Sequence, residues 1–134
     1  YMNLKIHHFG YLVKHIESTM RVFRSMGYDC MGRLVGDTTR KVDILFMHKD
    51  GHVVELIAPQ SKESPYYPLL ARFRNSIYHI CYETDQFEKD FAALQEEGFH
   101  CTVAPAKAAA FDGRRVAFFV HPHMGIVEVL DMYE

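Results

Sequence analysis

The stretch Lys5-Ile-His-His-Phe-Gly-Tyr-Leu-Val13 places a histidine in the middle of an apolar segment. The alternation of side chains along a strand would put four residues on one face, namely Ile6, His8, Gly10 and Leu12. A buried imidazole needs a partner for its ring nitrogens, because an unpaired buried polar group costs about 1–3 kcal/mol. The partner can be a backbone carbonyl, another side chain or a metal ion. For a single histidine, a structural role is the simplest interpretation.

A second stretch, Ile77-Tyr-His-Ile-Cys-Tyr-Glu83, repeats this pattern later in the chain. A shift of 71 residues places His8 on His79, and it also aligns Ile16, Phe23 and Gly27 with Phe87, Leu94 and Gly98. A shift of 73 residues places Val53-Val-Glu-Leu-Ile57 on Ile126-Val-Glu-Val-Leu130. An internal repeat of this length indicates two copies of one supersecondary unit.

Each copy combines strand-like alternation with one amphipathic helix, which predicts the order β-α-β-β-β. In the first copy we expect a helix from Ile16 to Gly27 and strands at residues 5–13, 34–35, 41–47 and 52–57. In the second copy we expect strands at residues 77–83, 100–103, 116–120 and 125–131. Asp85 and Glu88 resemble a capping box at the start of the second helix, which Gly98 ends.

The predicted fold class is therefore α+β, with two βαβββ modules. We expect one domain over residues 1–134, with module 1 at about 1–60, a linker at about 61–75 and module 2 at about 76–134. The chain is 49% hydrophobic and 24% charged, which is typical of a globular protein. A net charge of −2 offers no general attraction for nucleic acid or an anionic membrane.

The repeat supplies one histidine and one glutamate per half: His8 with Glu55, and His79 with Glu128. Both glutamates lie between apolar residues in strand-like segments, and an isolated buried carboxylate is very unfavourable. Two carboxylates and two imidazoles could satisfy one another around one divalent ion such as Zn, Ni, Co, Mn or Fe. Alternatively, the glutamates face solvent at strand edges and the histidines only pack. The presence of four such residues, related by one internal repeat, favours metal binding.

The chain resembles the vicinal oxygen chelate superfamily, which includes glyoxalases, bleomycin resistance proteins and dioxygenases. Five motifs carry the resemblance to its small bacterial glyoxalase I (lactoylglutathione lyase) and methylmalonyl-CoA epimerase group: Ile6-His-His-Phe-Gly-Tyr-Leu-Val13, Val54-Glu-Leu-Ile-Ala-Pro59, Tyr78-His-Ile-Cys81, Val116-Ala-Phe-Phe-Val-His-Pro122 and Gly125-Ile-Val-Glu128. By position, His8, Glu55, His79 and Glu128 match that group's metal ligands. The resemblance covers essentially the whole chain, and it implies that the two βαβββ modules form a curved mixed sheet around a metal site.

This resemblance implies a metal-dependent lyase or isomerase of the lactoylglutathione lyase type. Such an enzyme moves a proton next to a carbonyl through an enediolate on a thiol-linked substrate. The metal, most simply Ni, Co or Zn, acts as a Lewis acid, and a neighbouring carboxylate acts as general base. Glu128 is our first candidate for this base and Glu55 the second.

Two departures from the family pattern bear on the substrate. Epimerases carry a second carboxylate base near the position of Thr39, where only Asp37 is close, and this argues against two-base epimerisation. Glyoxalase I has an arginine that holds glutathione where this chain has Leu12. An acyl-CoA epimerase and a non-catalytic binding or resistance protein of the same fold therefore remain alternatives. An extradiol-type iron dioxygenase is less favoured, because that chemistry uses three protein ligands and this chain offers four.

Arg40, Arg114 and Arg115 are the candidate contacts for an anionic or thiol-adduct substrate, because guanidinium groups fit carboxylates and phosphates. Each could equally be a solvated charge in a turn. The three cysteines show no CxxC spacing, which suggests reduced thiols in a cytoplasmic protein, and we expect Cys81 to be a small core residue. No apolar run is long enough to cross a membrane. The resemblance also implies a homodimer, whereas the net charge of −2 is the reason that we expect no nucleic-acid partner.

Overall fold

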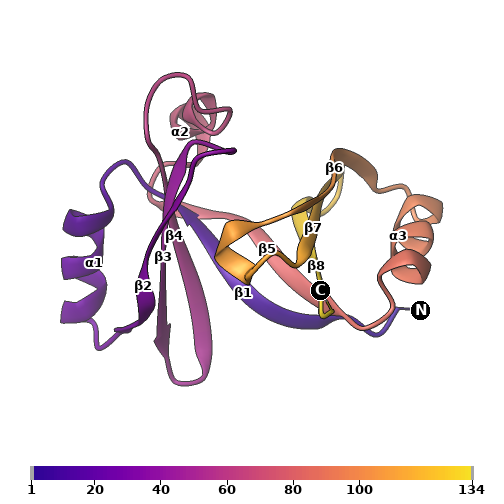
Figure 1. The fold of residues 1–134 in the computed structure, drawn as a ribbon, viewed down its shortest axis with the longest axis horizontal. Coiled ribbons are helices and arrows are strands. Elements are labelled where there is room, and N and C mark those ends of the chain that lie inside the picture. The colour runs from indigo at the N-terminus through magenta and orange to yellow at the C-terminus, as the bar shows by residue number, and fades with distance from the viewer. Residues whose placement is uncertain (1, 134) are drawn as a thin grey trace. The chain divides into compact units, whose positions relative to one another are not determined.

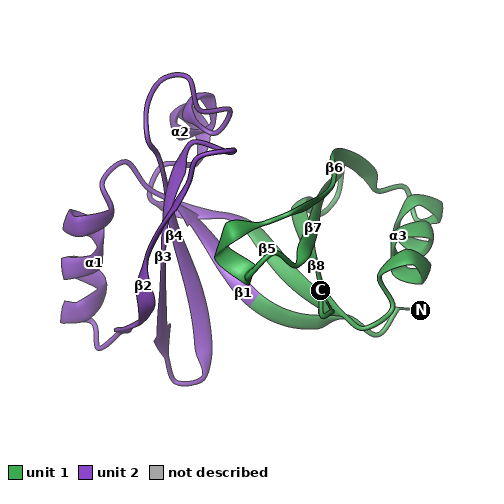
Figure 2. Ribbon diagram, in the orientation of Figure 1, with its two compact units in different colours: residues 1–7, 79–134 green, residues 8–78 purple. Residues whose placement is uncertain are grey.

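The structure is a computed structural model that describes residues 2–133 (Figure 1). It divides into two compact units, one formed by residues 8–78 and the other by residues 1–7 with 79–134 (Figure 2). Each half of the chain has the predicted order β-α-β-β-β, so the predicted α+β class is confirmed. The predicted linker, residues 61–75, lies within the unit of residues 8–78.

The unit of residues 8–78 contains most of β1 (Lys5–Leu12), followed by α1, three strands and two short helical turns. Their bounds are α1 (Ile16–Ser25), β2 (Asp29–Asp37), β3 (Val42–Lys49), β4 (His52–Pro59), η1 (Tyr67–Leu69) and α2 (Leu70–Phe73). The strand order is β2-β3-β4-β1, with β1 parallel to β4 and the other neighbours antiparallel. This mixed pairing follows from the helical crossover between β1 and the later strands.

Helix α1 covers one face of this sheet. Its apolar residues Ile16, Met20 and Phe23 pack on a core formed by Val13, Leu45, Met47, Val54, Leu56 and Ala58. The alternation of side chains then requires that the intervening residues of each strand face away from α1. This second face carries the candidate site residues of the unit.

The other unit contains most of β5 (Ser76–Thr84) and the elements that follow it. Their bounds are α3 (Phe87–Glu96), β6 (His100–Lys107), η2 (Ala109–Phe111), β7 (Arg115–His121) and β8 (Gly125–Asp131). The strand order is β5-β8-β7-β6, with β5 parallel to β8 and the rest antiparallel. Helix α3 packs on a core formed by Phe87, Leu94, Ala117, Phe119, Val127 and Val129.

The start of α3 differs from the predicted capping box. Its N-cap residue is Gln86, and no side chain caps it. Instead the Thr84 hydroxyl accepts a hydrogen bond from the Gln86 N–H at 2.9 Å and donates one to the Asp90 carboxylate at 2.5 Å. The prediction of Asp85 as N-cap was wrong, because Thr84, at the end of β5, already serves the turn that precedes the helix.

Three strand features also differ from expectation. Strands β2 and β6 are longer than predicted, because their pairing with β3 and β7 continues past irregularities in register. Ile6 is 60% exposed, whereas His8, Gly10 and Leu12 on the same predicted strand face are buried as expected. Among residues 2–133, no helix is both long and apolar enough to cross a membrane.

Candidate metal centre

The first candidate pair, His8 and Glu55, lies within the unit of residues 8–78. Both side chains are buried, with relative exposures of 0% and 3%. His8 Nε2 is 3.4 Å from Glu55 Oε1. Glu55 stands beside Gly10 in the parallel pairing of β1 with β4. The pair therefore occupies the face of the sheet opposite α1.

The second pair, His79 and Glu128, lies within the unit of residues 79–134 and has nearly the same geometry. Its exposures are 2% and 3%, and His79 Nε2 is 3.1 Å from Glu128 Oε1. Glu128 stands beside Cys81 in the parallel pairing of β5 with β8. The internal repeat thus reproduces a buried imidazole and carboxylate in each half, on the face opposite α3.

An aromatic ring completes each pair, and sequence reasoning missed both rings. The ring centroid of Phe46 lies 5.5 Å from that of His8, edge to face at 79°. Phe118 has the equivalent relation to His79, at 5.4 Å and 86°. Phe46 pairs with Glu55 across β3 and β4, and Phe118 pairs with the second glutamate across β7 and β8. A shift of 72 residues relates the two phenylalanines, and this was the signal available in the sequence.

The donor set of each pair fits a divalent ion. Imidazole nitrogen and carboxylate oxygen bind such ions at about 2.0–2.2 Å, so two ligand atoms of one ion are about 2.9–3.5 Å apart. The separations of 3.4 and 3.1 Å lie in this interval. Both separations exceed the roughly 2.7–2.9 Å of a charge-assisted hydrogen bond. Each half of the chain thus offers one nitrogen and one oxygen ligand, both withdrawn from water.

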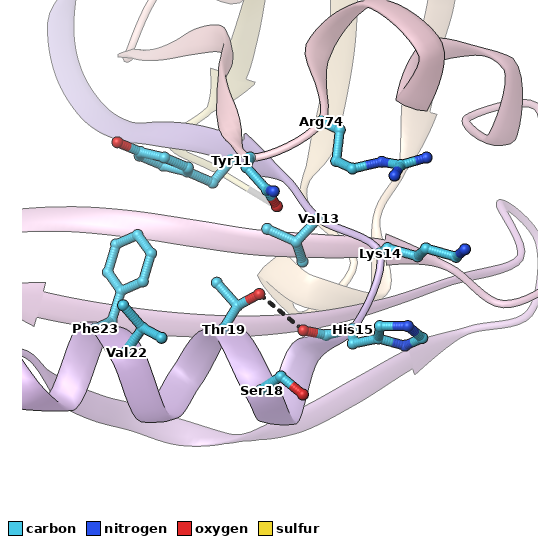
Figure 3. Close-up of a pocket in the computed structure, with 10 residues that line it drawn as sticks. Tyr11, Val13, Lys14, His15, Ser18, Thr19, Val22, Phe23 and Arg74 are labelled. Carbon is cyan, nitrogen blue, oxygen red and sulfur yellow. Dashed lines mark hydrogen bonds between the residues drawn. The ribbon is translucent and has the colours of Figure 1, made fainter.

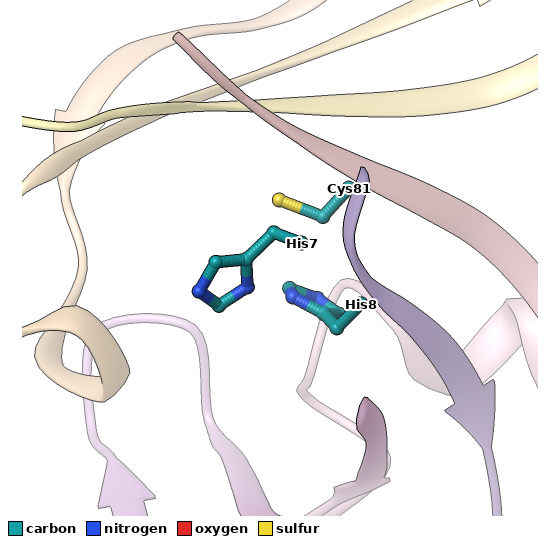
Figure 4. Close-up of side chains that lie close together, drawn as sticks. All are labelled: His7, His8 and Cys81. Carbon is teal, nitrogen blue, oxygen red and sulfur yellow. The ribbon is translucent and has the colours of Figure 1, made fainter. Parts of the chain in front are cut away.

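Two further side chains lie next to the paired histidines in the sequence: His7 precedes His8, and Cys81 follows His79 by two residues. Figure 4 shows the His7 imidazole and the Cys81 thiol near each other in the unit to which both belong. Cys81 is fully buried, as expected, and the His7 ring meets Phe111 edge to face with centroids 5.6 Å apart. All three cysteines are free thiols.

Of the three predicted substrate contacts, Arg40 is held in the turn between β2 and β3. Its guanidinium Nη1 lies 3.0 Å from Asp37 Oδ2, and its backbone N–H donates to Asp37 Oδ1 at 3.0 Å. Asp37 is only 4% exposed, so this carboxylate fastens the turn. The one acidic residue near the position of an epimerase's second base is therefore already engaged by a cation.

Arg114 and Arg115 follow η2 and point to different partners. Arg114 Nη1 is 3.5 Å from Glu83, and its Nε–H donates to the Phe111 carbonyl at 3.3 Å. Arg115 Nη2 lies 2.8 Å from both Asp131 and Glu88. The hydrogen bonds to these two carboxylates raise the pKa of Arg115 above its usual value. Consecutive arginines therefore have separate ion pairs.

The two repeated modules, each with a buried histidine and glutamate, define the class of protein to which the chain belongs. Residues 7–118 match the Glyoxalase/Bleomycin resistance protein/Dioxygenase superfamily. This match spans more than half of the chain, and the protein is a member of that superfamily. Among curated protein sequences, none matches the chain.

Solved structures share the fold over nearly the whole chain. A hypothetical protein from Bacillus halodurans C-125 is 24% identical with a TM-score of 0.85, covering 99% of this chain and 97% of its own. Streptomyces coelicolor methylmalonyl-CoA epimerase, in complex with 2-nitronate-propionyl-CoA, is 20% identical with a TM-score of 0.80, covering 98% and 100%. The epimerase from Mycobacterium tuberculosis is 14% identical with a TM-score of 0.79, covering 98% and 88%. These similarities establish the fold.

Proposed function

We propose that His8, Glu55, His79 and Glu128 together bind one divalent ion, with Ni, Co or Zn as the candidates. The observation that carries this proposal is the repetition of a buried histidine and glutamate pair with ligand-like spacing in each module. Each of the four side chains offers one ligand atom and is buried. Four buried donors without a cation would leave two carboxylates away from water, which is costly.

The proposed activity is metal-dependent movement of a proton next to a carbonyl, as in a glyoxalase I-like lyase or isomerase. When bound, the ion would supply Lewis acidity worth several kcal/mol to the developing negative charge of an enediolate. The burial of both glutamates excludes bulk water from the carboxylate oxygens. A carboxylate in such a place can take up the substrate proton and return it.

Glu128 is proposed as the general base, with Glu55 as the second candidate. Phe118, opposite Glu128, is 7% exposed, so the carboxylate is flanked by an aromatic ring on one side. Glu55 is flanked by Phe46 and Gly10 in the same manner. The two environments are nearly equivalent, which supports a role for either glutamate in moving the proton.

The proposed substrate is a thiol adduct of a 2-oxoaldehyde with an anionic group. Arg40, Arg114 and Arg115 are the proposed contacts for that group. Arg114 is paired with one carboxylate at 3.5 Å, whereas Arg115 is shared by two carboxylates at 2.8 Å. Leu12 is fully buried in the core, so glutathione cannot be held from that position as it would be by an arginine.

Acyl-CoA epimerisation is the second candidate, supported by the shared fold with methylmalonyl-CoA epimerases. Both reactions begin with removal of a proton beside a carbonyl, and the same glutamates would serve. A second acid or base is needed on the opposite face of the substrate for two-base epimerisation. Asp37 is an unfavourable choice, because it is buried and bonded to Arg40.

The decisive experiment begins with elemental analysis of protein purified without chelator, which should show about one divalent ion per chain. The metal-free protein is then reloaded with Ni, Co or Zn and assayed on a methylglyoxal thiol adduct. In parallel, deuterium exchange into a methylmalonyl thioester is followed by NMR. Product from the first substrate supports the lyase or isomerase, and exchange without such product supports the epimerase.

The same experiment separates catalysis from binding. Absence of metal, or metal without either activity, would support a non-catalytic binding or resistance protein of this fold. A homodimer in the cytoplasm is part of the proposal. Light scattering of the purified protein measures whether it is a dimer.

A further inference from the structure

A separate cavity lies within the unit of residues 8–78, between α1 and the segment that leads into β5. Its volume is about 490 Å³, which falls within the roughly 300–1,000 Å³ typical of small-molecule sites. None of the proposed metal ligands lines it. The lining residues are Tyr11, Val13, Lys14, His15, Ser18, Thr19, Val22, Phe23, Arg74 and Asn75.

The cavity is built by contacts that bring distant residues to the end of β1. The Asn75 N–H donates to the Leu12 carbonyl at 2.7 Å, which holds Arg74 beside the first turn of α1. Asn75 adopts a left-handed backbone with φ of 60°, a conformation that asparagine tolerates better than most residues. At the opposite wall, the Thr19 hydroxyl donates to the His15 carbonyl at 2.8 Å. The walls are therefore fixed by hydrogen bonds at both ends.

The fully charged side chains that line the cavity are all positive. Lys14 and Arg74 are its full cations, and no aspartate or glutamate lines the cavity. Within the described part of the chain, neither cation has a carboxylate within ion-pair distance. Glu17, the acidic residue in the first turn of α1, is directed instead to Arg21, at 3.6 Å. Two unneutralised cations at one cavity favour an anion.

The remaining lining is largely apolar. In Figure 3, Tyr11, Val22 and Phe23 lie to one side of the cavity, and the side chains of Lys14 and Arg74 lie to the other. Val22 is 63% exposed, so its side chain is open to solvent at the cavity wall. A ligand that fits both halves has an apolar body and an anionic end.

We propose that this cavity binds a small amphipathic organic anion, with its acyl or aromatic body against Tyr11, Val22 and Phe23 and its anionic group between Lys14 and Arg74. Thr19 and Ser18 add hydroxyl groups to the lining. The pairing of a carboxylate or phosphonate with a guanidinium can be bidentate, which fixes the orientation of the ligand. This site is independent of the proposed metal centre.

The test is fluorescence titration of the whole chain with 8-anilinonaphthalene-1-sulfonate, followed by competition. We expect saturable binding of one dye per chain, displaced by octanoate but not by octylamine of equal chain length. Lys14→Gln combined with Arg74→Gln should weaken dye and octanoate binding roughly tenfold or more, because it removes both cationic contacts to the anionic group. Val22→Gln, an exposed position, should weaken both as well.

A matched control removes the same charges elsewhere in the same unit, with Lys62→Gln combined with Arg72→Gln, and should bind as the original protein does. Glu128→Gln should also leave this binding unchanged, which separates the cavity from the metal centre. Equal binding by the Lys14 and Arg74 double variant, equal displacement by octylamine, or no saturable binding would each overturn the proposal. The dye and octanoate serve as probes. The dye titration and the competition are both measured on folded protein.

Discussion

Phe118 lies directly opposite Glu128 in the pairing of β7 with β8, and the same ring meets His79 edge to face at 5.4 Å. One aromatic side chain therefore contacts the histidine and neighbours the glutamate of the same pair. Phe46 has this relation to His8 and Glu55. The repeat thus preserves three residue types per module, with a phenylalanine ring packed edge to face on each imidazole.

Replacement of Phe118 by leucine should weaken metal binding without removing a ligand. Groups that orient a metal-binding histidine typically contribute about 10–100-fold to affinity, and we expect a loss near the lower end. Affinity is measured by competition with a chelating dye. Phe91→Leu is the control, because Phe91 packs on Phe119 under α3 and its loss should lower stability alone. Equal affinity losses in both variants would contradict an orienting role.

Replacement of Glu128 by glutamine should reduce metal-dependent turnover by about 10²–10⁴-fold, the usual contribution of a general base. Glu55→Gln is compared with it under saturating metal, so that loss of a ligand and loss of the base are distinguished. The larger loss in kcat at full metal occupancy identifies the base. Exposed Glu96→Gln on α3 is the control. Full metal-dependent turnover by both site variants would exclude the proposed chemistry.

Introducing arginine at Leu12 should unfold the protein and should not create a glutathione contact. Leu12 is fully buried, and an unpaired charge in such a place costs several kcal/mol. Leu12→Met, which conserves volume, should cost less than about 1.5 kcal/mol. Urea denaturation of both variants measures the difference. A folded arginine variant with near-native stability would show that the position has access to solvent.

Replacing Thr84 by valine should destabilise the protein by about 1–3 kcal/mol, because it removes the hydroxyl bonded to Asp90 and to the Gln86 N–H. Asp90 is 6% exposed and would lose this partner inside the protein. Calorimetry should show a lower Tm. Thr39→Val, at an exposed turn, is the control. A change no larger than that of the control would mean that water replaces the lost hydroxyl.

The ion pair between Glu88 and Arg115 should give a pH-dependent contribution to stability. The hydrogen bond from Arg115 lowers the pKa of Glu88 below its ordinary value of 4.5. A carboxylate with a lowered pKa stabilises the folded state fully above its ordinary pKa, and this contribution disappears as the pH falls through the lowered value. Glu88→Gln should therefore have a lower urea midpoint at neutral pH.

In acid the Glu88→Gln variant and the original protein should converge, and added salt should narrow their difference at neutral pH, because the pair is at the surface. Urea midpoints measured from neutral pH into acid test this directly. A difference that stays constant over the whole range would show that the substitution acts through packing on α3 instead.

The sequence by itself determined the βαβββ order of each half and the identity of the two histidine and glutamate pairs. These features depend on periods of 2.0 and 3.6 residues and on an internal repeat, which are local properties of the chain. The positions of His8 and His79 on buried strand faces follow from the same alternation. Cys81 in the core was also predictable.

Only the tertiary structure decided which side chains surround those pairs. The positions of Phe46 and Phe118 depend on strand register, and register is set by pairing between residues that are distant along the chain. The same holds for the partners of Arg40 and Arg115, and for the hydroxyl of Thr84 at the start of α3. Ion pairs and caps depend on which segments meet, so residue type and spacing could nominate these groups but could not assign their contacts.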